Sequence, residues 1–178
     1  MPQSFSVIGV SKRELSDVEF QAYVENSLRT FSRRLTNDRS KMEEFLHAFR
    51  YTSLDVTNAQ GYKKLLEMVQ RREKELNIPE NRMFYLSVAP EFFEVIAANI
   101  KESGLGSAKG WKRLIIEKPF GHDVKSAQDL NKKLSQAFEE DEIYRVDHYL
   151  GKPMVQNLEA IKFANSVFHF KQSGTISI

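Results

Sequence analysis

The chain reads Arg145-Val146-Asp147-His148-Tyr149-Leu150-Gly151-Lys152-Pro153 where its polar chemistry is densest, and nowhere else do an acid, an imidazole, a phenol and an ammonium fall so close together. Residues 142–146, just before the acid, have the pattern of a short strand. Pro153 opens a helical pattern with apolar residues at Met154, Leu158 and Ile161. The cluster therefore lies where a strand gives way to a helix, and in an open parallel sheet ligands collect at that edge.

These side chains could bind an anion and orient a catalytic base. Lys152 supplies a positive charge for a phosphate, and His148 and Tyr149 can donate hydrogen bonds to its oxygens. Asp147 would repel a phosphate, and its best use is to orient an imidazole N–H and hold that ring in one tautomer. The alternative is a solvated loop with a helix-capping Asp, but for the group as a whole we favour function.

Three motifs in this order resemble the glucose-6-phosphate dehydrogenase family. They are Glu117-Lys118-Pro119-Phe120-Gly121, the segment 145–152 read as RVDHYLGK, and Met154-Val155-Gln156-Asn157-Leu158. The resemblance covers most of the chain, from about Phe5 to Phe168.

Strand and helix patterns alternate from Phe5 to Pro153, which predicts a doubly wound parallel α/β sheet, a Rossmann-like dinucleotide-binding domain. The patterns predict strands over 5–10, 51–56, 82–88 and 111–117, in addition to the strand before Asp147. No glycine-rich turn precedes Phe5, whereas the resembled family has one there, so we expect the domain to be incomplete at its first strand. We assign residues 1–153 to this domain and 154–178 to the start of a connection towards a C-terminal α+β domain.

Two loops after predicted strands are candidates for binding a dinucleotide. Lys12 and Arg13 follow the first predicted strand, where in a dinucleotide fold a cation suits the 2′-phosphate of NADP. An ordinary solvated loop is the alternative, and the resemblance favours NADP. Ser87 and Pro90 lie where the strand at 82–88 passes into a helix, and the resemblance places this loop beside the cofactor, although Pro90 by itself is more typical of a helix start.

Lys118 precedes Pro119, and a residue before proline favours an extended backbone. We expect this conformation to direct the Lys118 ammonium across the carboxyl ends of the strands. Such a lysine could bind a sugar hydroxyl or the cofactor, and Pro119 lies in the same loop. A surface lysine before a turn is the alternative. Lys118 matches the family's substrate-contacting lysine, so we predict a functional role.

The resemblance implies oxidation of glucose 6-phosphate at C1 to 6-phosphogluconolactone, with hydride transfer to NADP, the first step of the pentose phosphate pathway. In the family a histidine of the C-terminal domain is the base; Asp147 matches the acid that orients it, and His148, Tyr149 and Lys152 match the phosphate site. Because neither the glycine-rich loop nor that histidine is found in these 178 residues, we expect the isolated chain to be inactive or nearly so.

Two other functions remain open. One is a different sugar oxidoreductase carrying a Glu-Lys-Pro segment, although such enzymes are not expected to carry Asp-His-Tyr-Leu-Gly-Lys. The other is a non-catalytic fragment that associates with itself or with partners through an uncovered sheet edge.

The amino-acid composition limits the classes of binding partner and the cellular compartment that we expect. With 26 basic and 24 acidic residues the formal charge is +2, too balanced to predict nucleic-acid binding. The absence of cysteine favours a reducing compartment, and no apolar segment resembles a signal peptide or a membrane span, so we expect a cytoplasmic protein. Asp147 and His148 lack further ligands at metal-binding spacing, so we expect no metal site. We also expect a homo-oligomer.

Overall fold

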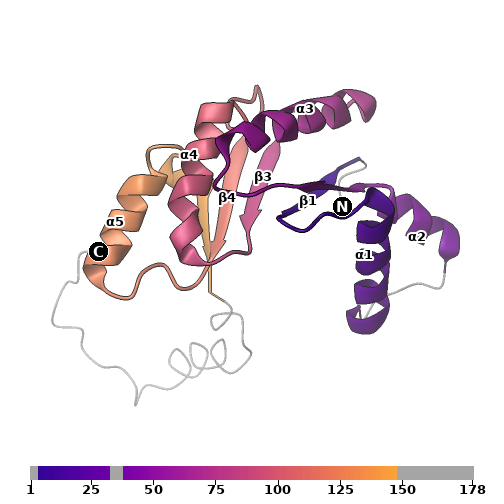
Figure 1. The fold of residues 1–178 in the computed structure, drawn as a ribbon, viewed down its shortest axis with the longest axis horizontal. Coiled ribbons are helices and arrows are strands. Elements are labelled where there is room, and N and C mark those ends of the chain that lie inside the picture. The colour runs from indigo at the N-terminus through magenta and orange to yellow at the C-terminus, as the bar shows by residue number, and fades with distance from the viewer. Residues whose placement is uncertain (1–3, 33–37, 148–178) are drawn as a thin grey trace, which may run out of the picture.

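The computed structural model describes residues 4–32 and 38–147, which form two parallel β-sheets with helices around them (Figure 1). One sheet pairs β1 (Val7–Ser11) with β2 (Phe49–Ser53), and the other has the order β3 (Arg82–Leu86), β4 (Lys112–Glu117), β5 (Ile143–Val146). The helices are α1 (Asp17–Phe31), α2 (Arg39–Leu46), α3 (Ala59–Glu75), α4 (Phe93–Ser103) and α5 (Val124–Leu134), with short 3₁₀ turns at Pro90–Phe92 and Glu140–Glu142.

The helix boundaries follow from local capping. Ser16 and Glu19 form a capping box at the start of α1, as their spacing predicts. Asp123 caps α5 by accepting a hydrogen bond from the Ser126 amide. Gly104 ends α4 in the left-handed conformation, with φ of 84°. The sequence therefore sets where these helices begin and end.

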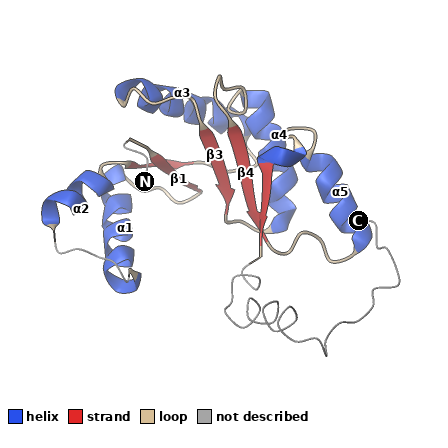
Figure 2. Ribbon diagram, turned by 180° about the vertical axis from the view of Figure 1, so that it is seen from behind, coloured by secondary structure: helices blue, strands red, loops and turns tan. Residues whose placement is uncertain are grey.

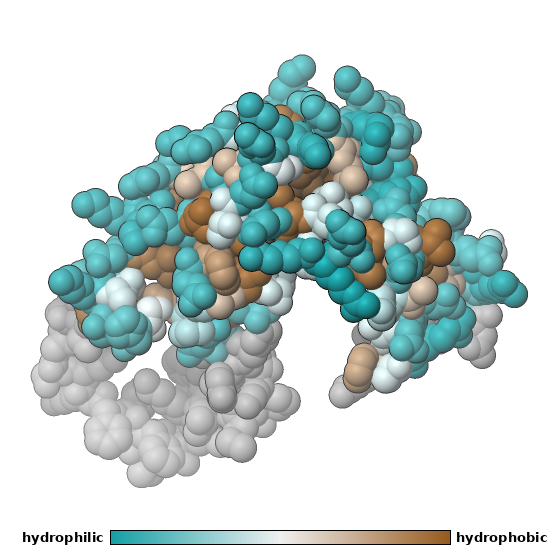
Figure 3. Space-filling model, in the orientation of Figure 1, coloured by the Kyte–Doolittle hydropathy of each residue, from teal (hydrophilic) through white to brown (hydrophobic). Residues whose placement is uncertain are grey.

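The larger sheet carries helices on one face. Figure 2 shows α3, α4 and α5 together on one side of β3, β4 and β5, while α1 lies beside the smaller sheet. The core lies between these helices and the sheet. Leu114 and Ile116 of β4 are 0% exposed there, and Phe93 and Phe138 are 1% exposed. Polar residues cover most of the outer surface, and the apolar ones show between the helices (Figure 3).

A second, smaller apolar cluster belongs to β1, α1, α2 and β2. Its aromatic rings are in contact, with centroids 5.1 Å apart for Phe45 and Phe49 and 5.2 Å apart for Phe20 and Tyr51. None of these rings belongs to the core cluster of the larger sheet. The described part of the molecule thus has two centres of packing.

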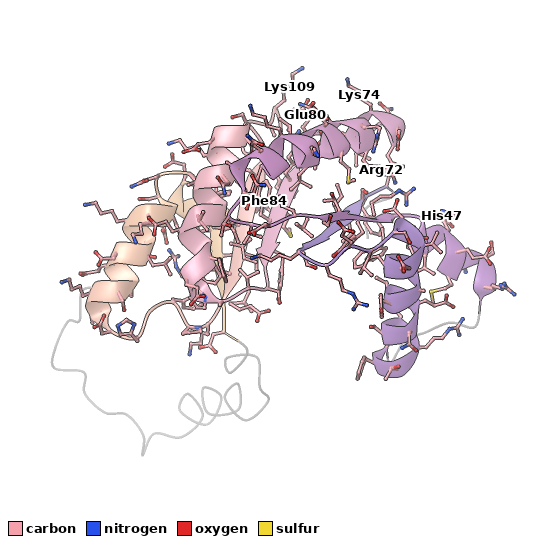
Figure 4. The ribbon with its side chains drawn as sticks, viewed as in Figure 1. His47, Arg72, Lys74, Glu80, Phe84 and Lys109 are labelled. Atoms are coloured by element: carbon pink, nitrogen blue, oxygen red, sulfur yellow. The ribbon has the colours of Figure 1, made fainter. Side chains whose placement is uncertain are left out.

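Helix α3 connects the two sheets. The Arg72 guanidinium contacts the Ser6 hydroxyl and the His47 carbonyl, each at 3.5 Å, and Figure 4 shows Arg72 between α3 and the segment that carries His47. The next residue, Glu73, makes a paired salt bridge of 2.8 and 2.9 Å to Arg82 at the start of β3. Adjacent residues of one helix therefore anchor the amino ends of β1 and β3.

The alternation of strands and helices and the parallel pairing confirm the expected α/β class. The difference is that the strands form two separate sheets, because β1 and β3 are not hydrogen-bonded to each other. Among the described residues no helix is both long and apolar enough to span a bilayer.

Candidate active site

Lys118 and Asp147 meet at the carboxyl ends of neighbouring strands. Glu117 of β4 is in register with Val146 of β5, so the next residue on each strand emerges at the same edge of the sheet. The Lys118 ammonium lies 2.7 Å from the Asp147 carboxylate. The sequence predicts that Lys118 binds a sugar hydroxyl or the cofactor and that Asp147 orients an imidazole, and neither motif by itself predicts this contact.

This ion pair is partly shielded from water. The Asp147 side chain is 18% exposed and that of Lys118 is 52% exposed, so the carboxylate lies inside and the ammonium faces outward. An ammonium has three N–H donors, and a bond to Asp147 is compatible with further bonds to an incoming hydroxyl or phosphate oxygen. The arrangement therefore presents a positive charge held in place by a fixed anion.

A tyrosine and a second carboxylate lie on the same sheet. Tyr85 is in register with Ile115, two residues before Glu117, and its hydroxyl donates a hydrogen bond to the Glu117 carboxylate. This bond, together with desolvation and the Glu117 charge, raises the pKa of Tyr85. The sequence patterns above do not identify Tyr85; the signal is strand alternation, which puts Tyr85 and Glu117 on one face.

The turn after Lys118 is tightly constrained. The Lys118–Pro119 peptide bond is cis, and Gly121 has φ of 131°. A Cβ atom at Gly121 would lie 2.7 Å from the backbone nitrogen of Ala127, in the first turn of α5. Glycine is therefore required here, because the chain must pass this close to α5.

Lys12 and Arg13 lie at the carboxyl end of β1 in a loop fixed by Tyr51. The buried Tyr51 hydroxyl donates to the Arg13 carbonyl at 2.6 Å and lies 2.8 Å from the Ser11 hydroxyl. The Arg13 guanidinium donates to the Tyr23 hydroxyl at 3.2 Å and lies over its ring. Both basic side chains are exposed, and their contact with a cofactor stays a prediction.

Asp55 is an unpredicted neighbour of this loop. Its carboxylate lies 3.1 Å from the Lys12 ammonium. Hydrogen bonds from the Thr57 hydroxyl and amide, and then from Lys12, lower the pKa of Asp55 to about 2. A phosphate that binds Lys12 must therefore compete with a permanent anion. The signal in the sequence is Asp-Val-Thr, which begins two residues after β2 and is typical of an Asx turn.

Ser87 and Pro90 lie in the loop that follows β3. Ser87 is exposed, and Pro90 begins the 3₁₀ turn that leads into α4. The helix-start interpretation of Pro90 is confirmed, and cofactor contact by either residue stays a prediction. Among residues 4–32 and 38–147 no three His, Cys, Asp or Glu side chains gather as a metal site would require.

Comparison with known proteins identifies the family. Residues 1–157 match the family model described as "Glucose-6-phosphate dehydrogenase, NAD binding domain". The chain belongs to the glucose-6-phosphate dehydrogenase family. The Rossmann-like fold expected from the strand and helix pattern agrees with this membership, and a family with an NAD binding domain implies a nicotinamide dinucleotide cofactor.

Relatives named glucose-6-phosphate 1-dehydrogenase align along most of the chain. That of Bacillus subtilis is 46% identical over 166 residues, and that of Leuconostoc mesenteroides is 40% identical over 168 residues. A solved glucose-6-phosphate dehydrogenase in complex with its substrate glucose 6-phosphate is 36% identical, with a TM-score of 0.76 over 92% of this chain. The structure of the Mycobacterium avium enzyme has a TM-score of 0.67 at 30% identity. The chain spans about a third of the length of these relatives, from 33% to 34%.

Part of the family motif lies outside the described residues. His148, Tyr149 and Lys152, expected to hold a phosphate, follow directly after Asp147 and are not among them. The segment 154–178 also lies outside. The assignments made for these residues therefore stay predictions.

Proposed function

We propose that this chain is part of an enzyme that oxidises glucose 6-phosphate at C1 to 6-phosphogluconolactone and transfers the hydride to NADP. The observation that carries the proposal is the Lys118–Asp147 ion pair at the carboxyl ends of β4 and β5, in a chain of this family. The solved relative with glucose 6-phosphate bound supports the substrate. The reaction is the first step of the pentose phosphate pathway.

Lys118 positions the sugar. Its outward-facing ammonium donates to a sugar hydroxyl, while Asp147 keeps the ammonium at the edge of the sheet. A base must take the C1 hydroxyl proton as hydride leaves, and a neutral imidazole suits this task near pH 7. Asp147 supports that imidazole when it becomes charged. His148, Tyr149 and Lys152 hold the phosphate and convert remote binding energy into positioning of C1.

The loop at Lys12 and Arg13 selects NADP. NADP, when bound, would supply the nicotinamide that accepts hydride, and Lys12 and Arg13 would hold its 2′-phosphate. Asp55 weakens this preference, because its carboxylate already pairs with Lys12. The two basic side chains therefore act together, with Arg13 held over Tyr23 and ready to approach the phosphate.

The isolated 178 residues turn over little or not at all, because the chain supplies only some of the groups that the reaction needs. The intact enzyme is cytoplasmic and a homo-oligomer. NADPH formation, followed by absorbance with glucose 6-phosphate and NADP, tests the activity directly. A rate comparable to that of the Bacillus subtilis relative would contradict our proposal for the isolated chain.

Substrate binding is tested separately by ligand-observed NMR, which detects weak complexes. Lys118→Met should weaken glucose 6-phosphate binding by about tenfold or more, since a charge-assisted hydrogen bond contributes about 1.5–3 kcal/mol. Lys133→Met is the matched control, because Lys133 also makes a 2.7 Å ion pair, with Glu94 between α5 and α4, away from the strand ends. Equal affinities for the two variants would refute the role of Lys118.

A further inference from the structure

The carboxyl ends of β1 and β2 bring one cation and one acid to the same place. Ser11, the last residue of β1, is in register with Ser53, the last residue of β2, so the residues that follow both strands emerge at one edge. Lys12 follows β1 directly, and its ammonium lies 3.1 Å from Oδ2 of Asp55. The two side chains are 66% and 43% exposed, so both can contact a ligand at this edge.

Asp55 is held in one orientation by Thr57. The Thr57 amide and hydroxyl donate to Oδ1 of Asp55 at 2.9 and 2.7 Å, so this oxygen is occupied and Oδ2 faces Lys12. These bonds, and then the one from Lys12, lower the pKa of Asp55 to about 2, so the group is an anion at neutral pH. A carboxylate has about four acceptor positions, and its contacts with described residues fill three. The remaining position is on Oδ2, beside the Lys12 ammonium.

An acid and a cation at this edge recognise different cofactors. In dinucleotide folds an acid accepts a hydrogen bond from the ribose 2′-hydroxyl of NAD, whereas a cation accommodates the 2′-phosphate of NADP. The hydroxyl can donate to the open position on Oδ2. A 2′-phosphate is largely dianionic at neutral pH and has no such donor, so Asp55 repels it while Lys12 attracts it.

We propose that Asp55 determines the cofactor selectivity of this site, because it accepts a hydrogen bond from the ribose 2′-hydroxyl of NAD and disfavours the 2′-phosphate of NADP. The inference rests on the proposed function, in which Lys12 and Arg13 hold that phosphate, and it adds a second mode of binding to the same site. With NAD, the Lys12 ammonium stays with Asp55. With NADP it turns to the phosphate, which leaves two anions close together. The preference for NADP is therefore weaker than the two cations alone would produce.

Two fragments of the cofactors test this proposal on the chain of 178 residues. Adenosine 5′-monophosphate carries the free 2′-hydroxyl, and adenosine 2′,5′-bisphosphate carries the 2′-phosphate. Ligand-observed NMR gives both dissociation constants, and their ratio measures the selectivity for the 2′-phosphate. Asp55→Asn should raise this selectivity by about tenfold, because the amide oxygen can keep the Thr57 bonds while the NH₂ group replaces an acceptor by a donor. An unchanged or lower selectivity would overturn the proposal.

Asp38→Asn is the matched control and should leave the selectivity unchanged. Asp38 is 41% exposed, accepts a hydrogen bond from the Lys41 amide and pairs with the Lys41 ammonium at 3.5 Å, but it caps α2 instead of following a strand. An increase as large as that in Asp55→Asn would show a general effect of net charge, and the proposal would be wrong.

Lys12→Met separates this inference from the proposed function. Removal of the ammonium should lower the selectivity, since the 2′-phosphate loses a partner while Asp55 keeps its acceptor. If Lys12→Met lowers the selectivity and Asp55→Asn does not raise it, only the role of Asp55 is wrong. If neither variant changes it, the cofactor does not bind at this loop, and the proposed role of Lys12 and Arg13 fails as well.

Discussion

Removing the carboxylate of Glu73 should strongly destabilise the fold. The Glu73 and Arg82 side chains are only 11% and 6% exposed, and the two bonds between them measure 2.8 and 2.9 Å. Glu73→Ala leaves a buried guanidinium whose remaining acceptor among the described residues is the Leu105 carbonyl, at 2.9 Å. Breaking a buried ion pair in this way costs about 3–5 kcal/mol. Because the bond to Leu105 persists, we expect about 3 kcal/mol.

Urea unfolding measures this loss. Trp111, the only tryptophan in the sequence, lies next to β4 and reports on the sheet by fluorescence. The urea dependence should keep its slope while the midpoint falls. A loss of about 3 kcal/mol is a large part of the roughly 5–15 kcal/mol typical of folded domains, and the variant would be clearly less stable.

Two controls decide the interpretation. Glu25→Ala removes a carboxylate from an exposed pair with Arg29, where the side chains are 36% and 56% exposed, and should cost about 0.5 kcal/mol or less. The double variant Glu73→Leu with Arg82→Met removes both charges and should recover most of the lost stability. If Glu73→Ala costs no more than Glu25→Ala, the argument from burial is wrong.

Three further outcomes follow from single residues. Gly121→Ala should cost about 1–3 kcal/mol in urea unfolding, since φ is 131° and the new Cβ would meet the Ala127 backbone. Asp55→Asn should make the melting temperature less dependent on pH below about pH 4. The Asp55 carboxyl has a pKa of about 2 in the folded protein, against an ordinary value of 3.8. The ionised carboxylate therefore stabilises the folded wild-type protein fully above pH 3.8, and this stabilisation is lost as the pH falls from there towards 2. A wild-type-like acid slope in that variant would contradict this cause. Ser16→Ala should cost about 1 kcal/mol through loss of the α1 cap, and an unchanged urea midpoint would show that the cap contributes little.

The elements of the fold could be predicted from the sequence because their signals are local. The capping residues Ser16 and Asp123 mark the starts of two helices. The strand predicted at 51–56 lies at Phe49–Ser53, so it begins and ends earlier than expected. Pairing between distant strands has no local signal, so the separation into two sheets could not be predicted.

The sequence identified individual residues of the candidate site but not the contacts between them. Lys118 and Asp147 each follow a strand in a recognisable motif, but their contact depends on the register of β4 with β5. The neighbours that modify the site, Asp55 beside Lys12 and Tyr85 beside Glu117, come from segments far apart in sequence. These contacts act through space, and a single sequence gives no measure of that distance.

The division of packing between two apolar clusters has a consequence for unfolding. The rings around Phe45 and Tyr51 can lose their order while Leu114 and Phe138 remain packed, because the clusters share none of these side chains. Helix α3 belongs to the larger unit, because Tyr62, Leu65 and Val69 pack into its cluster, and Arg72 links the helix to the smaller unit. The contacts of Arg72 with Ser6 and His47 therefore contribute to how closely the unfolding of the two units is coupled.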